Sequence, residues 1–326
     1  MNLLRSTVLA LAAAAAIGAP AAAAPAASAP ASPPGKPPTH QVVFVIVMEN
    51  HDAKAIMGNE KEAPYINRVL LKSYAHATHF VDELPLEIPS EPHYVWMEAG
   101  THRFADHTFT DDPDPSAANS TASTEHLATQ IRATNGRVDW RAYQEGMDTA
   151  RTGACPVASA GLYGAKHDPY VFFQDVAGSP PSRTNAYCAS HHKDFKALAG
   201  DLEKNAVATY NFITPDLCND MHGARACPDG TVRIGDRWLE KHLPALIRYV
   251  DAHDGVVFLT WDEGEDTLQM PFIAIGPHVK PGYAGPVRYT HGSMLKSVER
   301  ILQLPYLPTV AKDNDLADLF VPGTYP

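Results

Sequence analysis

Polar side chains suited to metal or proton chemistry follow directly on apolar runs in this sequence. A run of seven apolar residues ends in Glu49 and Asn50, and a second, mainly apolar run ends in Asp262 and Glu263. Carboxylate and amide oxygens are the ligands that hard cations such as Ca²⁺, Mg²⁺ and Mn²⁺ prefer. Because clustered carboxylates repel one another unless a cation holds them, these four residues predict a site for a divalent metal ion.

Ser90 is the candidate nucleophile. It lies in the motif PSEPHY, ahead of a segment in which Pro92 could begin a helix. A serine in front of a helix is by default an N-cap. The same place favours a phosphate, because helix-start N–H groups and the helix dipole attract anions. A serine oxygen beside a divalent metal also loses its proton more easily and could attack phosphorus. Both interpretations of Ser90 stay open on local sequence alone.

The elements that must position these residues are apolar runs alternating with helical patterns. Helices are expected over 235–255, where Pro244 would kink or divide the helix, and over 292–305. Strands are expected over 42–48, 79–81, 208–214, 256–261 and 272–275. This order predicts an α/β fold, a mainly parallel sheet sandwiched by helices. Ligands bind beyond the carboxyl ends of such strands, where Glu49, Asp216 and Asp262 fall.

Bulk composition limits the partners. The 326 residues carry a formal net charge of -11 with no basic block, so nucleic acid is not expected as a partner. Residues 1–24 have the pattern of a secretory signal peptide, and Pro/Ala-rich residues 25–40 have that of a linker. We therefore expect a secreted or periplasmic protein with a single domain over 41–326 and no stable membrane span after signal cleavage. The polar segment 111–205 is expected to pack as long insertions over the sheet edge.

The four cysteines all lie in the exported part of the chain. An even number in an oxidising compartment suggests two disulfides. Of the three pairings, the close pair Cys218–Cys227 would close a local loop and leave Cys155 with Cys188. The alternative, a zinc site of cysteines, lacks any C-x-x-C spacing.

Two other hydrolase classes find little support. No G-x-S-x-G motif occurs, which weakens a serine esterase of the α/β-hydrolase type. The sulfatase family would place arginine four residues after its nucleophile, but that position holds Tyr94. A sulfate- or phosphonate-ester hydrolase remains an alternative, with this missing arginine against the sulfatase.

Six motifs together resemble one known family. VIVMENHD, PSEPHY, YGAKHDPYVFF, NFITPDLCNDMHG, TWDEGE and YTHGSMLKSVERIL occur in the order found in the phosphoesterase family of secreted acid phosphatases and phospholipases C. That family belongs to the alkaline-phosphatase-like superfamily. The resemblance runs from about residue 41 to residue 304. It implies an alkaline-phosphatase-like fold and the hydrolysis of phosphate esters.

The resemblance also implies roles for individual residues. A divalent metal ion would be held by Glu49, Asn50, Asp262 and Glu263 and touched by Ser90, the nucleophile. Asp216, His222 and His291 would lie on the other side of the phosphate, where they would bind a second cation, orient the phosphate or protonate the leaving group, with Asp220 a secondary candidate. His167 would lie near the substrate. The oxygen ligands suit Ca, Mg or Mn, and the histidines would bring in Zn or Fe.

One departure from the family pattern leaves alternatives open. The family often has Asn after the second proline of PSxPNY, where this chain has His93, a residue that could bind phosphate or act as an acid. We expect an acid phosphatase that cleaves phosphomonoesters through a phosphoserine. The alternatives are a phospholipase C that removes lipid head groups and a non-catalytic, secreted protein that binds the metal and phosphate.

Overall fold

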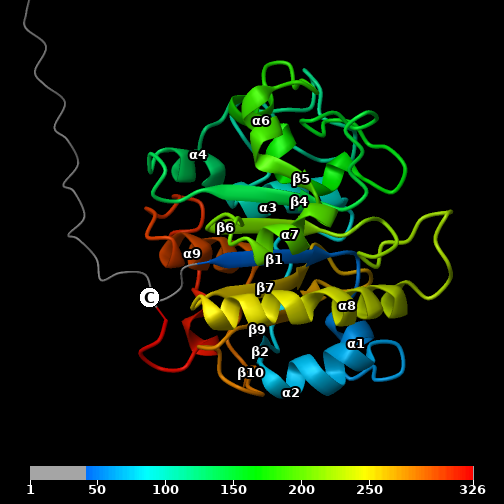
Figure 1. Cartoon of the computed structure of the whole chain (residues 1–326), viewed down its shortest axis with the longest axis vertical. Helices are drawn as coiled ribbons and strands as arrows, with labels where there is room; N and C mark the ends of the chain where they lie inside the picture. The colour runs from blue at the N-terminus through cyan, green and yellow to red at the C-terminus, as the bar shows by residue number, and fades with distance from the viewer. Residues whose placement is uncertain (1–41, 326) are drawn as a thin grey trace, which may run out of the picture. The chain divides into compact units, whose positions relative to one another are not determined.

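The computed structural model describes residues 42–325, so the expected signal peptide and linker lie outside the described residues. Eight strands form one sheet in the order β10-β2-β9-β7-β1-β6-β4-β5 (Figure 1). Their bounds, in that order, are Ala284–Gly285, Ala75–Ala77, Phe272–Ile275, Val256–Trp261, Val43–Met48, Tyr210–Thr214, Trp140–Gln144 and His192–Asp194. The five strands from β7 to β5 run parallel, whereas β9 is antiparallel to β7 and to β2.

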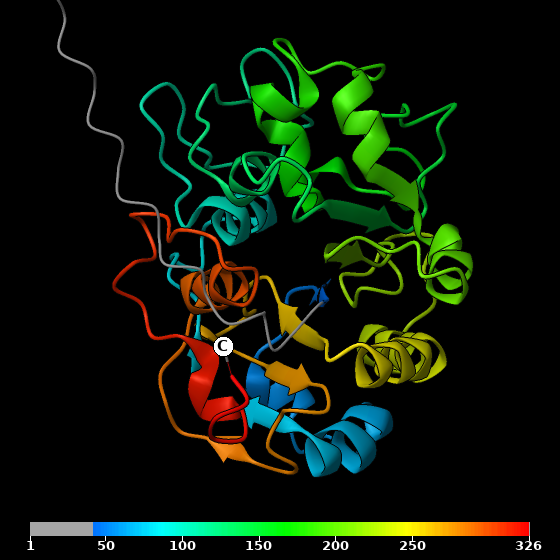
Figure 2. The same ribbon diagram turned by 60° about the vertical axis from the view of Figure 1, so that its left-hand side comes forward.

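Helices cover both faces of this sheet. Figure 2 shows α8 (Thr231–Ala252) against one face and α3 (Ser90–Ala99) and α9 (His291–Ile301) against the other. The other helices are short: α1 Ala53–Ile56, α2 Leu71–Ser73, α4 Leu127–Arg132, α5 Gln174–Ala177, α6 Ala186–His191, α7 Leu198–Glu203, a π-helix at Ile66–Leu70 and 3₁₀ turns at Ala165–His167, Pro169–Phe172, Phe195–Ala197 and Leu316–Leu319. The layers confirm the predicted mainly parallel, helix-covered α/β fold.

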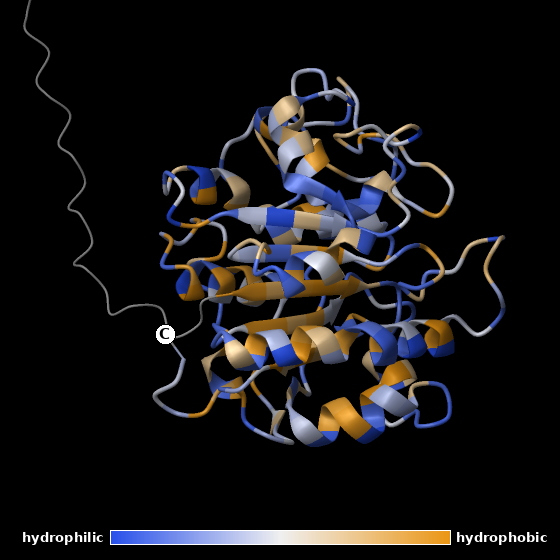
Figure 3. Cartoon of the chain, in the orientation of Figure 1, coloured by the Kyte–Doolittle hydropathy of each residue, from blue (hydrophilic) through white to orange (hydrophobic). Residues whose placement is uncertain are grey.

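The centre of the sheet is its most apolar part. Every residue of β1 and β7 is buried, and both strands are hydrophobic along most of their length in Figure 3. Apolar side chains of α8 pack inward from one face of that helix, as its 3.6-residue spacing requires. Helix α8 runs through Pro244 without a break, so neither a division nor a second helix forms there.

Two sequence expectations needed correction, and one strand was missed. Segment 111–205 does more than cover the sheet, because it supplies the edge strand β5 and its neighbour β4. The run at 79–81 does not join the main sheet: β3 (Phe80–Val81) pairs with β8 (Gln269–Met270) in a separate two-stranded sheet. The short strand β2 was not predicted.

Both expected disulfides are present. Cys155 is bonded to Cys188, and Cys218 to Cys227. Since all four cysteines are paired, none is available for a zinc site. Within residues 42–325, no helix is both long and apolar enough to cross a membrane.

Candidate active site

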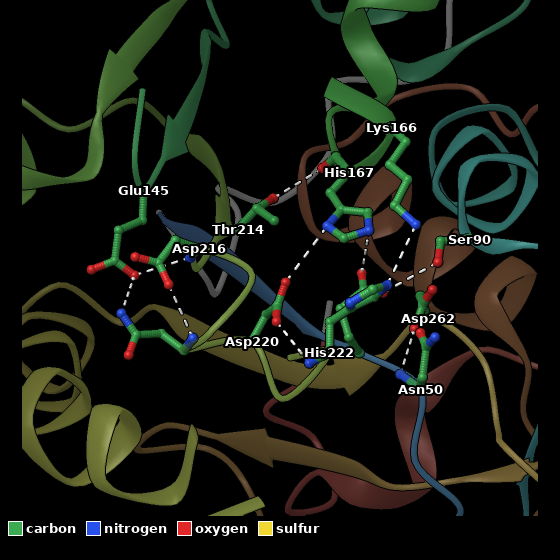
Figure 4. Close-up of polar contacts among 12 residues, drawn as sticks. Asn50, Ser90, Glu145, Lys166, His167, Thr214, Asp216, Asp220, His222 and Asp262 are labelled. Carbon is green, nitrogen blue, oxygen red and sulfur yellow. Dashed lines mark hydrogen bonds and ion pairs between the residues drawn. The ribbon is translucent and has the colours of Figure 1, made fainter. Parts of the chain in front are cut away.

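Two neighbouring parallel strands deliver the predicted metal-binding group. Glu49 and Asn50 follow β1, Asp262 and Glu263 follow β7, and the ends of the two strands are register partners. Asn50 has a φ of +44°, a left-handed conformation that Asn tolerates, and its N–H donates to Asp262 Oδ1 at 3.1 Å. The structure therefore brings together all four residues of the predicted set, and Figure 4 shows Asn50 beside Asp262.

The side-chain amide of Asn50 lies between two carboxylates. One of its terminal atoms is 2.8 Å from Glu49 Oε2 and 3.3 Å from Asp262 Oδ1. If that atom is the amide nitrogen, it donates to both carboxylates. If it is the oxygen, three acceptors converge with no proton between them, an arrangement that a cation would stabilise.

Ser90 is the first residue of α3, and its hydroxyl does not cap the helix. The preceding Pro89 is the N-cap residue and has no capping side chain, and the helix-start N–H of Glu91 donates to Asp112 Oδ1 at 2.9 Å. Instead, the buried Ser90 Oγ lies 3.2 Å from Glu49 Oε2 and 3.3 Å from Glu263 Oε1. The hydroxyl thus faces the carboxylate group at the start of a helix, and the N-cap interpretation is wrong.

The second oxygen of Glu49 leads to a group of histidines. Glu49 Oε1 accepts a short hydrogen bond from the Tyr94 hydroxyl and lies 3.3 Å from His167 Nε2. Ligand atoms of Glu49, His167 and His222 lie within 4.8 Å of one another, so this trio could also hold a metal ion. His222 Nδ1 is 2.7 Å from the Gly223 carbonyl oxygen. The sequence placed His167 near the substrate but did not pair it with Glu49.

The contacts of Asp216 and Asp220 differ from those that the sequence suggested. The carboxylate of Asp216 accepts hydrogen bonds from the backbone N–H groups of Cys218 and Asn219, at 3.0 and 3.1 Å. It therefore stabilises a turn, and Figure 4 shows it beside Glu145, on the side away from Ser90. Asp220 is the buried residue that faces His167, with its Oδ2 3.6 Å from His167 Nδ1. Of the two, Asp220, the secondary candidate, is the one that contacts the histidines, and the substrate contact of Asp216 stays a prediction.

His291 and His93 lie on a different side of the site from His222. Buried His291 donates from Nε2 to the backbone carbonyl of Asp262 at 2.6 Å, while its Nδ1 has no partner. His93 donates from Nδ1 to the Pro89 carbonyl at 2.9 Å, and its Nε2 forms a 2.9 Å ion pair with Asp82. Asp82 carries no motif signal and was missed.

Lys166 and Glu145 were also missed. Lys166 Nζ lies 2.7 Å from Asp112 and 3.5 Å from His222 Nε2, so it brings a positive charge to the site. It stands beside the predicted His167 in the motif YGAKHDP, which could have drawn attention to it. Glu145 follows β4 and accepts from the Asp216 N–H at 3.1 Å. Because β4 was not predicted, Glu145 could not be placed.

Burial gives the site unusual proton affinities. Burial raises the pKa of the carboxyls of Glu49, Asp220 and Asp262, the first two well above their usual range. Burial and the charge of Asp262 raise the pKa of Glu263 to about 8. These carboxyls cannot all ionise easily by themselves, and a bound divalent cation is the partner that would let them do so.

The pKa values of buried His291 and buried His93 shift in opposite directions. Burial lowers the pKa of His291 to about 4, so this ring is neutral near pH 7. Burial by itself would lower the pKa of His93, but contact with Asp82 and the charges of Asp262 and Glu263 raise it to about 9. His93 therefore brings a positive charge to the place where the family often has Asn.

Comparison with known proteins agrees with this geometry. The model of the Phosphoesterase family matches residues 68–305. The chain belongs to the Phosphoesterase family. This phosphoesterase is 29% identical to a phosphatidylinositol-3-phosphatase of Mycobacterium tuberculosis over 270 residues, covering 82% of this chain and 79% of that protein. Family membership and relatives named as phosphatases place it among hydrolases of phosphoric esters.

Fungal relatives are longer proteins. A probable acid phosphatase of Kluyveromyces lactis is 26% identical over 293 residues, covering 86% of this chain and 62% of that protein. A phosphate-repressible acid phosphatase of Penicillium chrysogenum is 28% identical over 258 residues, covering 73% of this chain and 53% of that protein. The phosphoesterase thus spans between half and two thirds of these two relatives.

Solved structures confirm the alkaline-phosphatase-like fold. Murine ectonucleotide pyrophosphatase/phosphodiesterase 5 superposes with a TM-score of 0.56 at 10% identity, covering 86% of this chain and all of that one. A protein of the alkaline phosphatase superfamily from Vibrio parahaemolyticus superposes with a TM-score of 0.51 at 11% identity, covering 89% and 73% of the two chains. At these identities the likeness concerns the fold alone.

Proposed function

We propose that this phosphoesterase is a secreted, metal-dependent acid phosphatase that cleaves phosphomonoesters through a phosphoserine at Ser90. The observation that carries the proposal is the position of the Ser90 hydroxyl. It lies at a helix start, does not cap that helix, and is within 3.3 Å of the buried carboxylates of Glu49 and Glu263. A serine with these neighbours suits attack on phosphorus better than it suits a structural role.

The residues around Ser90 fit a divalent cation. Glu49, Asn50, Asp262 and Glu263 offer oxygen ligands, and the buried Asp262 Oδ2 has no hydrogen-bond partner. Burial raises the pKa of the three carboxyls, a cost that a cation would remove. When bound, the cation would neutralise phosphate oxygens and lower the pKa of the serine hydroxyl. The oxygen-rich set suits Ca, Mg or Mn, whereas inclusion of His167 and His222 would suit Zn.

Different side chains of the site take part in different steps of phosphoryl transfer. Ser90 Oγ forms a bond to phosphorus and passes its proton to Glu49 or Glu263, at 3.2 and 3.3 Å, while the bond from phosphorus to the leaving oxygen breaks. His222 lies on the cavity beside Ser90, where it can give a proton to the leaving oxygen. Water then cleaves the phosphoserine and releases phosphate and free Ser90. Lys166 and His93 supply the positive charge that stabilises the transferring group.

His291 takes a positioning role in this scheme. Its Nε2 holds the backbone of Asp262, and its pKa of about 4 leaves it neutral, so it has no proton on Nδ1 to donate. The leaving-group acid is therefore assigned to His222 and not to His291. His167 and Asp220 orient Glu49 and the His222 loop.

Export of the chain is part of the proposal. The signal-like residues 1–24 lie outside the described residues, but two disulfides are the kind of bond that forms and persists in an oxidising compartment. We therefore place the enzyme in the periplasm or outside the cell.

The test compares two chromogenic esters on purified protein whose metal content has been measured. p-Nitrophenyl phosphate is a monoester, and p-nitrophenyl phosphorylcholine is a choline diester. We expect turnover of the monoester that a chelator abolishes and that added metal restores. Preference for the diester would indicate a phospholipase C instead. No turnover of either ester with metal bound would favour the non-catalytic binding protein.

A further inference from the structure

A cavity of about 490 Å³ opens from the candidate active site towards solvent. Its inner end includes His222 and Glu263, the second of which touches Ser90. Its outer walls come from two loops, residues 86–89 before α3 and residues 263–265 after β7. A phosphate held at Ser90 would point its leaving group into this space. The chemistry of these walls therefore bears on which alcohols fit.

The outer walls carry negative charge. Glu87 and Glu265 both line the cavity and both are exposed, the side chain of Glu265 to 69%. Among the described residues that line it, there is no lysine or arginine. The nearby Lys54 is engaged by Asp52 at 3.2 Å and Asp266 at 3.6 Å, so it does not balance the two glutamates. His51 also lines the cavity, with its Nδ1 3.8 Å from Glu265 Oε2.

The same walls offer apolar surface. Leu86 is 41% exposed, which is high for a large hydrophobic side chain in this protein. Ile88 and Pro89, both half-buried, continue that wall. Carbon-rich groups would bury part of this surface on binding. A subsite for a highly anionic group would instead be lined by basic side chains.

We propose that this cavity is the leaving-group subsite, and that it selects monoesters of uncharged or cationic, partly apolar alcohols and phenols over esters that carry further anionic groups. This inference rests on the proposed phosphomonoesterase function. The phosphate itself is held by the inner residues. A second anionic group would lie against Glu87 and Glu265, which would repel it, whereas an ammonium group would be attracted.

The size of the effect follows from screened charge interactions. Two unit charges on the order of 8 Å apart in water change an equilibrium by about twofold. Reversing the charge of a substrate in front of two carboxylates is therefore expected to change kcat/KM by about fivefold in about 0.1 M salt. The preference should nearly vanish in about 1 M salt, because the screening length is then shorter than these distances.

Three matched substrates test the inference. The phosphate monoesters of tyramine, 4-ethylphenol and 3-(4-hydroxyphenyl)propionic acid share one aryl leaving group and differ only in the far end, which is cationic, neutral or anionic. We expect kcat/KM to fall in that order. Glu87→Gln and Glu265→Gln should each reduce the ratio between the cationic and the anionic ester. Glu203→Gln, at the exposed end of α7, is the matched control and should keep that ratio.

The outcomes separate the inference from the function beneath it. Hydrolysis of all three esters without a charge preference, or with the anionic ester preferred, would overturn the leaving-group inference alone. A ratio unchanged in both glutamate variants would also overturn it. Failure to hydrolyse even the neutral ester would overturn the proposed phosphatase function, and this inference with it.

Discussion

Asp52 fixes the loop that carries Glu263, and replacing it tests how that loop is held. Asp52 is only 3% exposed to solvent, and its Oδ1 accepts four hydrogen bonds from the loop. The donors are the N–H groups of Glu265, Asp266 and Thr267, at 3.2, 3.2 and 2.9 Å, and the Thr267 hydroxyl at 2.9 Å. Burial opposes ionisation of Asp52, but these hydrogen bonds and Lys54 outweigh burial and lower its pKa.

The expected loss of stability follows from these bonds. A hydrogen bond to a charged group contributes about 1.5–3 kcal/mol net. Because four donors share one oxygen, we count them as about two full hydrogen bonds. Asp52→Ala should then lower the free energy of unfolding by about 4 kcal/mol. Asp52→Asn keeps an acceptor but loses the charge, so about half of that loss is expected.

The assay is urea denaturation combined with kinetics. Asp266→Ala is the matched control, because its carboxylate belongs to the same loop, is 75% exposed and pairs with Lys54. An exposed pair of this kind contributes about 0.5 kcal/mol. Asp52→Ala should also lower kcat by about tenfold or more, since Glu263 would no longer be held beside Ser90. An Asp52→Ala variant as stable and as active as Asp266→Ala would refute this account of the loop.

Three further predictions concern the metal, pH and one disulfide. Glu49→Ala or Asp262→Ala should lower both bound metal and kcat by at least about tenfold, measured by elemental analysis and turnover; full metal content would contradict the ligand assignment. Because folding raises the pKa of Glu263 to about 8, the folded carboxyl keeps a proton that the unfolded one loses near pH 4.5. Metal-free protein should therefore lose stability as pH rises from about 4.5 to about 8. The increase in Tm on adding metal should then be larger at about pH 8 than at about pH 5. An equal increase at both pH values would argue against this prediction. Replacing Cys218 and Cys227 by Ala should cost about 2.5 kcal/mol and lower activity by loosening the loop that bears His222; unchanged denaturation and turnover would contradict this.

The sheet was predictable where its strands are mainly apolar. β1 and β7 are buried on both faces, so each is an apolar run in the sequence. The outer strands β4 and β5, at one end of the sheet, contain Arg141, Gln144 and Lys193, and their pattern does not separate them from loops. Pairing across long sequence distances defines them, and no local signal reports that pairing. The short β2 and β3 were missed or misplaced for the same reason.

The active-site residues at strand ends were predictable, and their outer partners were not. Glu49 and Asp262 stand out because a polar group directly after a buried strand has a defined place in a parallel sheet. Asp216 and Asp220 are four residues apart in one turn, and only the fold decides which of them faces inward. Asp82 approaches His93 through a loop contact that leaves no pattern in the sequence.

The central claim is that Ser90 carries the phosphoryl group during turnover. The most direct measurement is to mix the metal-loaded enzyme with ³²P-labelled monoester, quench in acid during turnover, and locate the label by peptide mass spectrometry. The account predicts label on Ser90 in the unmodified protein, and no label and no turnover in Ser90→Ala with its bound metal nearly intact. Turnover by Ser90→Ala at the rate of the unmodified protein, or the absence of label on Ser90 while the unmodified protein turns over, would contradict it.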